Sequence, residues 1–143
     1  MFRNSILKTS AIVCGVMVMG LLANLTPAAA QLSPPPGGVK RTILQKVDVP
    51  GTNFEMVLAI AEIPAKAAAG RHTHFGPETA TVLEGDLVLK VDGQPDKTVK
   101  VGESYQVPGG TVHDAIMGDK PVKIIVSYAI EKGKPLATPA PAK

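Results

Sequence analysis

The stretch HTHFGPE, residues 72–78, decides the fold prediction together with one histidine further along the chain. His72 and His74 are two positions apart, so an extended strand would direct both imidazoles to one face of a sheet. The Gly-Pro pair that follows can turn the backbone and bring Glu78 back toward the same point. His113 completes the three histidines of the chain. Although each histidine could be an ordinary surface or core residue, imidazoles and a carboxylate in this arrangement favour a site for one metal ion.

This arrangement resembles the two signature motifs of the cupin superfamily. The matching positions are His72, His74, Glu78 and Gly85 in the first motif, and Gly102, Pro108, Gly109, Gly110 and His113 in the second. The resemblance covers residues 40–132 and implies an all-β fold, a single-domain jelly roll built as a double-stranded β-helix barrel. It also implies that the three histidines and the glutamate bind the metal inside that barrel.

Two positions depart from the family pattern. Lys66 stands where the first motif usually has glycine, and Met117 stands where the second motif often has asparagine. Neither position binds the metal in the family, so the implied ligand set is unchanged. Met117 does remove the polar contact that asparagine would make near the site.

Strand-like segments fill the middle of the chain independently of the resemblance. Short runs of strand-forming residues are separated by turn residues, and Asp92-Gly93 between two apolar runs is a strong hairpin signal. Regular spacing of this kind indicates an all-β sandwich or barrel. The predicted strands are residues 42–47, 54–63, 79–83, 87–91, 97–101, 104–107, 112–117 and 122–130.

The two ends of the chain differ in composition from the middle. Residues 1–30 combine a basic start, an apolar run and a final Ala-Ala-Ala, which is typical of a cleaved signal peptide. An uncleaved anchor is the alternative, but the apolar run is shorter than the about 20 residues of a membrane span. We therefore predict export to the periplasm or the extracellular space, with no stable membrane anchor after cleavage. Residues 31–39 are predicted to form a Pro/Gly-rich linker, and residues 133–143 a flexible Pro/Ala-rich tail without regular structure.

Cleavage of the signal would change the charge of the protein. The whole chain has a net charge of +3, but Arg3 and Lys8 lie in the signal, so two of the 15 basic residues would be lost and none of the 12 acidic ones. The mature chain would also lose Cys14, its one cysteine, and with it any disulfide. With little basic surplus and 3% aromatic residues, we predict no nucleic-acid partner.

Strand alternation indicates which residues line the barrel interior. Arg71 and Thr73 alternate with the two nearby histidines and are predicted to face away from the site. Glu103, Asp114 and Tyr128 are candidate acids or bases, although solvated carboxylates are the simpler interpretation of the first two. The candidate pocket residues, each of which could instead be ordinary core, are Met56, Leu58, Val82, Leu87, Met117 and Tyr128.

The ligand set favours one divalent transition metal, Fe, Mn, Ni, Cu, Co or Zn, over Ca or Mg, which prefer oxygen. Four protein ligands leave positions open on a six-coordinate ion, as working sites require. The resemblance implies a metal-dependent enzyme for a small organic substrate, with a quercetin-dioxygenase-like cupin as the first expectation. A decarboxylase, isomerase or lyase and a non-catalytic binder of a metal or small ligand are the alternatives. The family also implies a homodimer.

Overall fold

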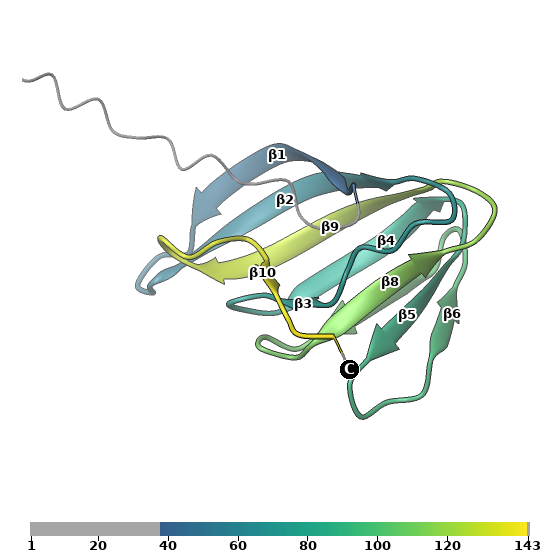
Figure 1. Ribbon diagram of the computed structural model, residues 1–143. Helices are drawn as coiled ribbons and strands as arrows, with labels where there is room; N and C mark the ends of the chain where they lie inside the picture. Colours follow the sequence, from purple (N-terminus) through teal and green to yellow (C-terminus); the bar gives the residue numbers. More distant parts are fainter. Residues whose placement is uncertain (1–37, 143) are drawn as a thin grey trace, which may run out of the picture. The chain divides into compact units, whose positions relative to one another are not determined.

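The computed structural model describes residues 38–142, which form ten strands in two antiparallel sheets (Figure 1). The predicted signal peptide and most of the predicted linker lie outside these residues. The first sheet has the strand order β1-β2-β9-β4-β7 and the second β10-β3-β8-β5-β6. The strands are β1 (Lys40–Asp48), β2 (Phe54–Ile63), β3 (His72–Thr73), β4 (Glu78–Glu84), β5 (Leu87–Val91), β6 (Lys97–Val99), β7 (Ser104–Val107), β8 (His113–Met117), β9 (Val122–Glu131) and β10 (Thr138–Pro139).

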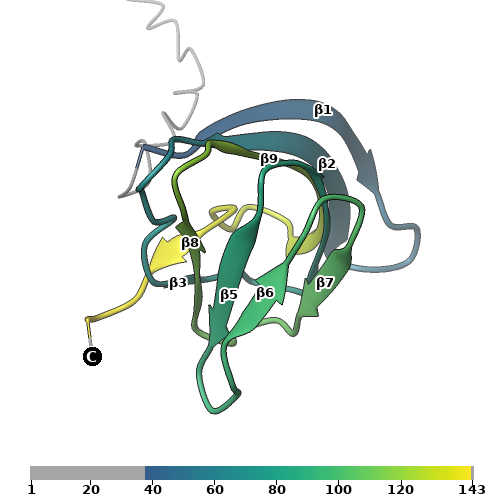
Figure 2. The same cartoon turned by 90° about the vertical axis from the view of Figure 1, so that its right-hand side faces the viewer.

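The two sheets face each other and enclose a common interior (Figures 1 and 2). No helix occurs between residues 38 and 142, and the prediction of an all-β jelly roll is confirmed. In that part of the chain there is consequently no helix of the length and apolar character that a membrane crossing needs.

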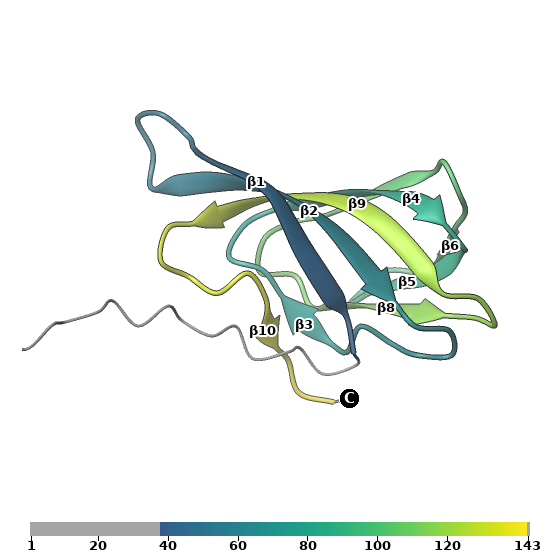
Figure 3. The ribbon, with the colours of Figure 1, turned by 90° about the horizontal axis from the view of Figure 1, so that it is seen from above.

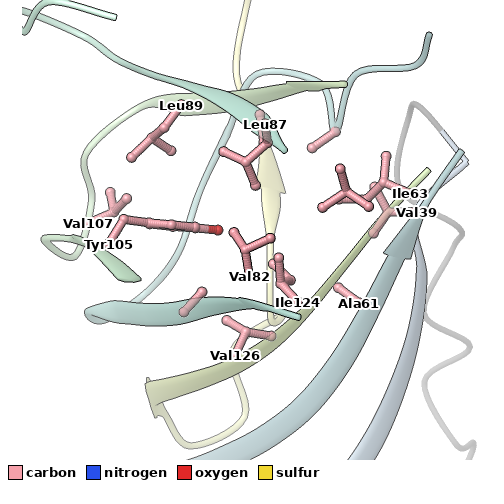
Figure 4. Close-up of a cluster of buried hydrophobic side chains, with 14 of the residues drawn as sticks. Val39, Ala61, Ile63, Val82, Leu87, Leu89, Tyr105, Val107, Ile124 and Val126 are labelled. Atoms are coloured by element: carbon pink, nitrogen blue, oxygen red, sulfur yellow. The ribbon is translucent and has the colours of Figure 1, made fainter. Parts of the chain in front are cut away.

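The inward-facing residues of β8 and β4 change from polar to apolar along the barrel. On β8 the buried residues are His113, Ala115 and Met117, in that order. On β4 a similar change runs from Glu78 to Val82. Since Met117 pairs with Leu87 and Val82 with Ile124, the apolar residues gather at one end of the interior and the polar ones at the other. Figure 4 shows part of the hydrophobic core, where buried side chains from both sheets point toward one another.

The buried face of β2 is the opposite of the predicted one. Met56 is 38% exposed and Leu58 lies on the same outward face, whereas the alternate positions, from Val57 to Ile63, are buried. The assignment of Met56 and Leu58 to the pocket is therefore wrong. Both faces of β2 are apolar. The prediction took the face with the larger side chains as the buried one, and the other face is buried. The inward positions Ala59 and Ala61 carry small side chains instead, and both are buried.

The predicted tail also forms regular structure. Thr138 and Pro139 form β10, which pairs with Thr73 and His72 of β3, so the prediction of a segment without regular structure is wrong. The segment has no periodicity of its own because its one short strand exists only as an addition to the edge of the second sheet. Figure 3 shows it leaving β9 and running back alongside β3.

Lys66 shows why the first motif usually carries glycine at this position. Its φ of 59° lies in the left-handed region, where it is the one non-glycine among the described residues. The turn is held by the Lys66 backbone N–H, which donates to the Gly118 carbonyl at 2.7 Å. Lys66 thus has a backbone conformation that glycine adopts at no steric cost.

Candidate metal centre

The structure brings the four predicted metal ligands together at the polar end of the barrel. We call His72, His74, Glu78 and His113 the ligand cluster; one ligand atom from each lies within 4.8 Å of the others. His72 of β3 pairs directly with His113 of β8, and Glu78 is the first residue of β4, so both sheets contribute. All four side chains are buried, with His72 the most exposed at 8%.

Each histidine uses one ring nitrogen for a backbone contact and keeps the other for the cluster. His72 Nδ1 lies 2.6 Å from the Gly70 carbonyl, His113 Nδ1 lies 3.0 Å from that of Thr111, and His74 Nδ1 contacts the carbonyl of Leu136. A carbonyl accepts only from a protonated nitrogen, so these contacts favour Nδ1–H and free Nε2 as a ligand atom.

Two buried ring nitrogens in the ligand cluster have no hydrogen bond within residues 38–142, which indicates whether a metal ion would fit between the four side chains. Nε2 of His74 and Nε2 of His113 lie 2.7 and 3.4 Å from Glu78 Oε2, yet neither has a well-directed hydrogen bond among the described residues. Buried polar atoms normally have a partner, and a cation between these groups would supply one. The donor set, three imidazole nitrogens and a carboxylate, therefore fits a single divalent transition metal.

The loop between His74 and Glu78 is held tightly by the surrounding backbone. Pro77 accepts from the Ala129 N–H at 3.1 Å, and the His74 carbonyl accepts from the Gly110 N–H at 2.9 Å. Gly76 lies so close to β9 that a β-carbon there would be 1.6 Å from the Ala129 carbonyl oxygen. These contacts fix the positions of the two ligands that flank the loop.

Electrostatics within the ligand cluster favour an ionised Glu78 carboxylate and make His113 easier to protonate when no metal is bound. Burial alone would raise the pKa of Glu78, but the adjacent imidazoles of His113 and His74 hold this pKa well below its usual range. Burial would lower the pKa of His113, but Glu78 raises it above the ordinary value. Burial and the charge of His113 lower the pKa of His72 to about 4, so His72 is neutral at physiological pH.

These shifts predict that metal affinity rises with pH up to the raised pKa of His113. A metal must displace the His113 proton, so affinity should increase about tenfold per pH unit below that pKa and level off above it. Zinc affinity measured by chelator competition between pH 6 and pH 9 would test this expectation. Calorimetry in two buffers of different ionisation enthalpy should show proton release near neutral pH, and a flat affinity profile would contradict the assignment.

Two tyrosines contact the ligand cluster. Tyr105 of β7 donates its hydroxyl to Glu78 Oε1 at 2.8 Å, and the ring of Tyr128 lies 4.8 Å from that of His74. Burial and the charge of Glu78 raise the pKa of both phenols. Tyr128 was among the predicted pocket residues, whereas Tyr105 was not. The polar–apolar alternation of residues 104–107, which puts Tyr105 and Val107 on one face of the strand, is the sequence signal that could have identified it.

Arg41 adds a positive charge to the same interior. It pairs with Ala61, which is 1% exposed, and directly opposed residues of antiparallel strands share one face, so Arg41 points inward. Its Nε is buried without a hydrogen-bond partner among the described residues. Its guanidinium partly offsets the raised pKa of Tyr105 and Tyr128. Sequence analysis did not identify Arg41, because the order of polar and apolar residues in β1 does not show which face of the strand points into the barrel.

The remaining candidate residues do not reach the ligand cluster. The hydrophobic core at the apolar end includes Val82, Leu87 and Met117, so these are ordinary core residues, the alternative given above to a role in the pocket. Glu103 is exposed and accepts from the Lys100 N–H in a turn. Asp114 accepts from the backbone N–H of its neighbour on the outward face of β8, so neither carboxylate acts at the site.

Arg71 also faces away from the ligand cluster, as predicted. Its guanidinium makes two hydrogen bonds to Asp92, at 2.8 and 2.9 Å. Its Nε donates to the Pro141 carbonyl at 2.9 Å. Arg71 therefore links the β5–β6 hairpin to the end of the chain.

Comparison with known proteins gives consistent results for fold. Residues 59–128 match the family described as Cupin domain. A dimethylsulfoniopropionate lyase, DddW, from Ruegeria pomeroyi is 29% identical over 75 residues, which are 52% of this chain. The aligned part is 49% of DddW, so this chain spans about half the length of that relative.

Solved structures share the barrel at low sequence identity. The dimethylsulfoniopropionate lyase DddQ from Ruegeria pomeroyi has a TM-score of 0.61 at 17% identity, covering 71% of this chain and 51% of DddQ. The polyketide cyclase RemF from Streptomyces resistomycificus has a TM-score of 0.59 at 22% identity, covering 76% of each chain. At such identities the similarity concerns the fold alone.

Proposed function

We propose that the chain is a cupin, since residues 59–128 match the Cupin domain family, and that it is a metal-dependent lyase that acts on a small organic carboxylate. The observation that carries the proposal is the set of groups inside one barrel: the ligand cluster, two phenols and an inward-pointing guanidinium. The similarity to the lyase DddW supports the same reaction class.

Arg41 is the proposed anchor for the substrate carboxylate. A guanidinium offers several N–H donors that match a carboxylate, and its buried Nε lacks a partner among the described residues. As metal ligands the three imidazoles would be neutral and Glu78 would carry one negative charge, so a bound divalent ion would leave the site positive. Both features favour an anionic substrate.

The two phenols are the proposed groups for proton transfer. A lyase of this kind removes a proton from the carbon next to the carboxylate, and the freed electron pair forms a carbon–carbon double bond as the leaving group departs. Tyr105 or Tyr128, as a phenolate, would accept the proton that leaves the carbon and become a phenol. A metal ion bound by the ligand cluster would supply Lewis-acid polarisation of a substrate oxygen. Burial and Glu78 raise the pKa of both phenols and Arg41 offsets this only in part, so the phenolate form would require the positive charge of a bound metal ion.

Dimethylsulfoniopropionate, the substrate named for DddW, is the first compound to test. Its elimination would break one C–H and one C–S bond and release neutral dimethyl sulfide, which headspace gas chromatography measures directly. We expect release by protein loaded with Mn, Fe, Co, Ni, Cu or Zn, and none by metal-free protein. If no metal form cleaves this compound or a panel of related β-substituted carboxylates, the lyase proposal fails.

A dioxygenase-like reaction is the second candidate. It is favoured by the ligand cluster itself, because three imidazoles and one carboxylate leave open positions on a six-coordinate ion for both a substrate and O₂. Oxygen consumption with a panel of phenolic substrates separates it from a lyase, which consumes no O₂. Tight ligand binding without turnover would instead support the non-catalytic alternative.

Substitution of Arg41 tests the substrate class. For a carboxylate substrate, Arg41→Gln should raise KM about 10- to 100-fold with a smaller change in kcat, because a charged contact made equally in the ground and transition states is lost. Lys40→Gln is the matched control: Lys40 is the neighbouring cation on β1, pointing outward in an exposed ion pair with Glu62 at 3.1 Å. Equal KM values for the two variants would show that Arg41 does not bind the substrate carboxylate.

Export and dimer formation are further proposals that rest on the sequence. The signal-like residues 1–30 support a periplasmic or extracellular location. Exposed apolar side chains on the outer face of β1 and β2, among them Val47 and Met56, support a homodimer that covers them. N-terminal sequencing of the secreted protein and light scattering of the purified protein test the two proposals separately.

A further inference from the structure

The end of the chain forms part of the wall around the ligand cluster. We call residues 133–142 the C-terminal strap. It leaves β9, crosses to the other sheet and adds β10 to the edge of β3 (Figures 1 and 3). Because β3 begins with His72 and ends just before His74, the strap lies directly beside two of the four ligands.

Several contacts hold the C-terminal strap in place. Leu136 packs against the hydrophobic core, and Lys134 lies over the Phe75 ring at 5.2 Å. Further along, the Ala140 N–H donates to the Arg71 carbonyl at 2.8 Å, and Arg71 Nε donates to the Pro141 carbonyl. The strap is therefore fixed on both sides of its short strand.

The three histidines differ in where their Nδ1 acceptors come from. His72 and His113 contact the carbonyls of Gly70 and Thr111, each two residues earlier in the chain, so these supports form with the local backbone. His74 contacts the carbonyl of Leu136, 62 residues away on the C-terminal strap. One of the three imidazoles thus depends on the strap for its orientation.

We propose that the C-terminal strap is a positioning element of the metal centre, in which the Leu136 carbonyl holds His74 with Nε2 directed at the ion. The proposal rests on the proposed metal site. Groups that hold the second nitrogen of a ligand histidine set its tautomer and orientation, and their loss typically reduces metal affinity about 10- to 100-fold. Docking of the strap and metal binding should therefore stabilise each other, as linkage requires.

Three shortened chains separate the contacts of the strap. A chain that ends at Pro141 keeps every contact described above and serves as the control. A chain that ends at Pro139 loses both bonds to Arg71 but keeps the Leu136 carbonyl, and a chain that ends at Pro135 loses that carbonyl. We expect zinc affinity, measured by chelator competition, to be unchanged in the first, reduced a few-fold in the second and reduced about 10- to 100-fold in the third.

Nitrogen NMR of the zinc-loaded protein supplies a readout specific to His74. In the full chain all three Nδ1 protons should give slowly exchanging signals. In the chain that ends at Pro135 the His74 signal should be lost while those of His72 and His113 remain, because their acceptors are local. General loosening of the fold would affect all three signals alike and would overturn the proposal.

Hydrogen exchange on the full chain keeps the proposal testable if the shortest chain does not fold. Zinc should slow exchange of the Ala140 amide, whose acceptor is the Arg71 carbonyl. Unchanged exchange, or equal zinc affinity in all three shortened chains, overturns the role of the strap and leaves the metal site intact. Failure of the full chain to bind zinc or any other metal tested would overturn the metal site as well.

Discussion

Replacing His113 with alanine is expected to abolish stoichiometric metal binding. The variant loses one of three imidazole ligands and also leaves the buried carboxylate of Glu78 with one fewer positive neighbour. Loss of a group that only hydrogen-bonds a ligand histidine typically lowers metal affinity about 10- to 100-fold. Loss of the ligand itself should therefore lower metal affinity more than about 100-fold. Metal analysis after purification and dialysis measures the outcome directly. His72→Ala and His74→Ala should give the same result.

Arg71→Ala is the matched control for the histidine variants. Arg71 neighbours His72 in the chain but points to the other face, where it binds Asp92 and the end of the C-terminal strap. It supplies no atom to the ligand cluster, and the Leu136 carbonyl still reaches His74 through the other strap contacts. Its metal content should therefore stay close to that of the unmodified protein. Undiminished occupancy in His113→Ala would end the four-ligand assignment.

The sequence predicted those parts of the site that depend on short-range geometry. His72 and His74 share a face because strand side chains alternate, and the interrupted strand after them allows Glu78 to return. Both relations hold within a few residues of chain. The place of His113 required the family resemblance, since strand pairing between distant segments is not visible in one sequence.

Features that depend on long-range packing were missed or predicted wrongly. The parity of β2 could not be read from a strand that is apolar on both faces, so Met56 was assigned to the interior although it is 38% exposed. Arg41 enters the barrel only because β1 pairs in a particular register with β2. β10 forms only because an edge of β3 is available to it.

The backbone of the ligand-bearing loop explains why glycine occupies position 76. A β-carbon at Gly76 would lie 1.6 Å from the Ala129 carbonyl oxygen and 2.8 Å from its carbon, both backbone atoms of β9. Neither can rotate away as a flexible side chain would, so either the loop or the strand must move. The same loop carries His74 at one end and Glu78 at the other, and its displacement would separate two ligands.

Gly76→Ala is therefore expected to reduce both stability and metal binding, although it adds only a methyl group and removes no metal ligand. Overpacking of a close-packed interior costs about 1–3 kcal/mol, and a contact this short should reach or exceed the upper end. In a domain of this size that corresponds to a melting temperature lower by more than about 10 °C. Thermal unfolding of metal-free protein and metal analysis at 20 °C measure the two effects separately.

Gly118→Ala is the control that isolates the role of this close approach. Gly118 is exposed, a β-carbon added to it would have no neighbour within 4 Å, and its backbone is not left-handed, so alanine should change stability by less than about 0.5 kcal/mol. Both variants add one methyl group to a glycine of the same barrel, and only the first places it against β9. If Gly76→Ala has the same melting temperature as Gly118→Ala and keeps its metal, the close approach to β9 does not hold the loop. The backbone of the loop must then be held by its hydrogen bonds to β9 and to Gly110.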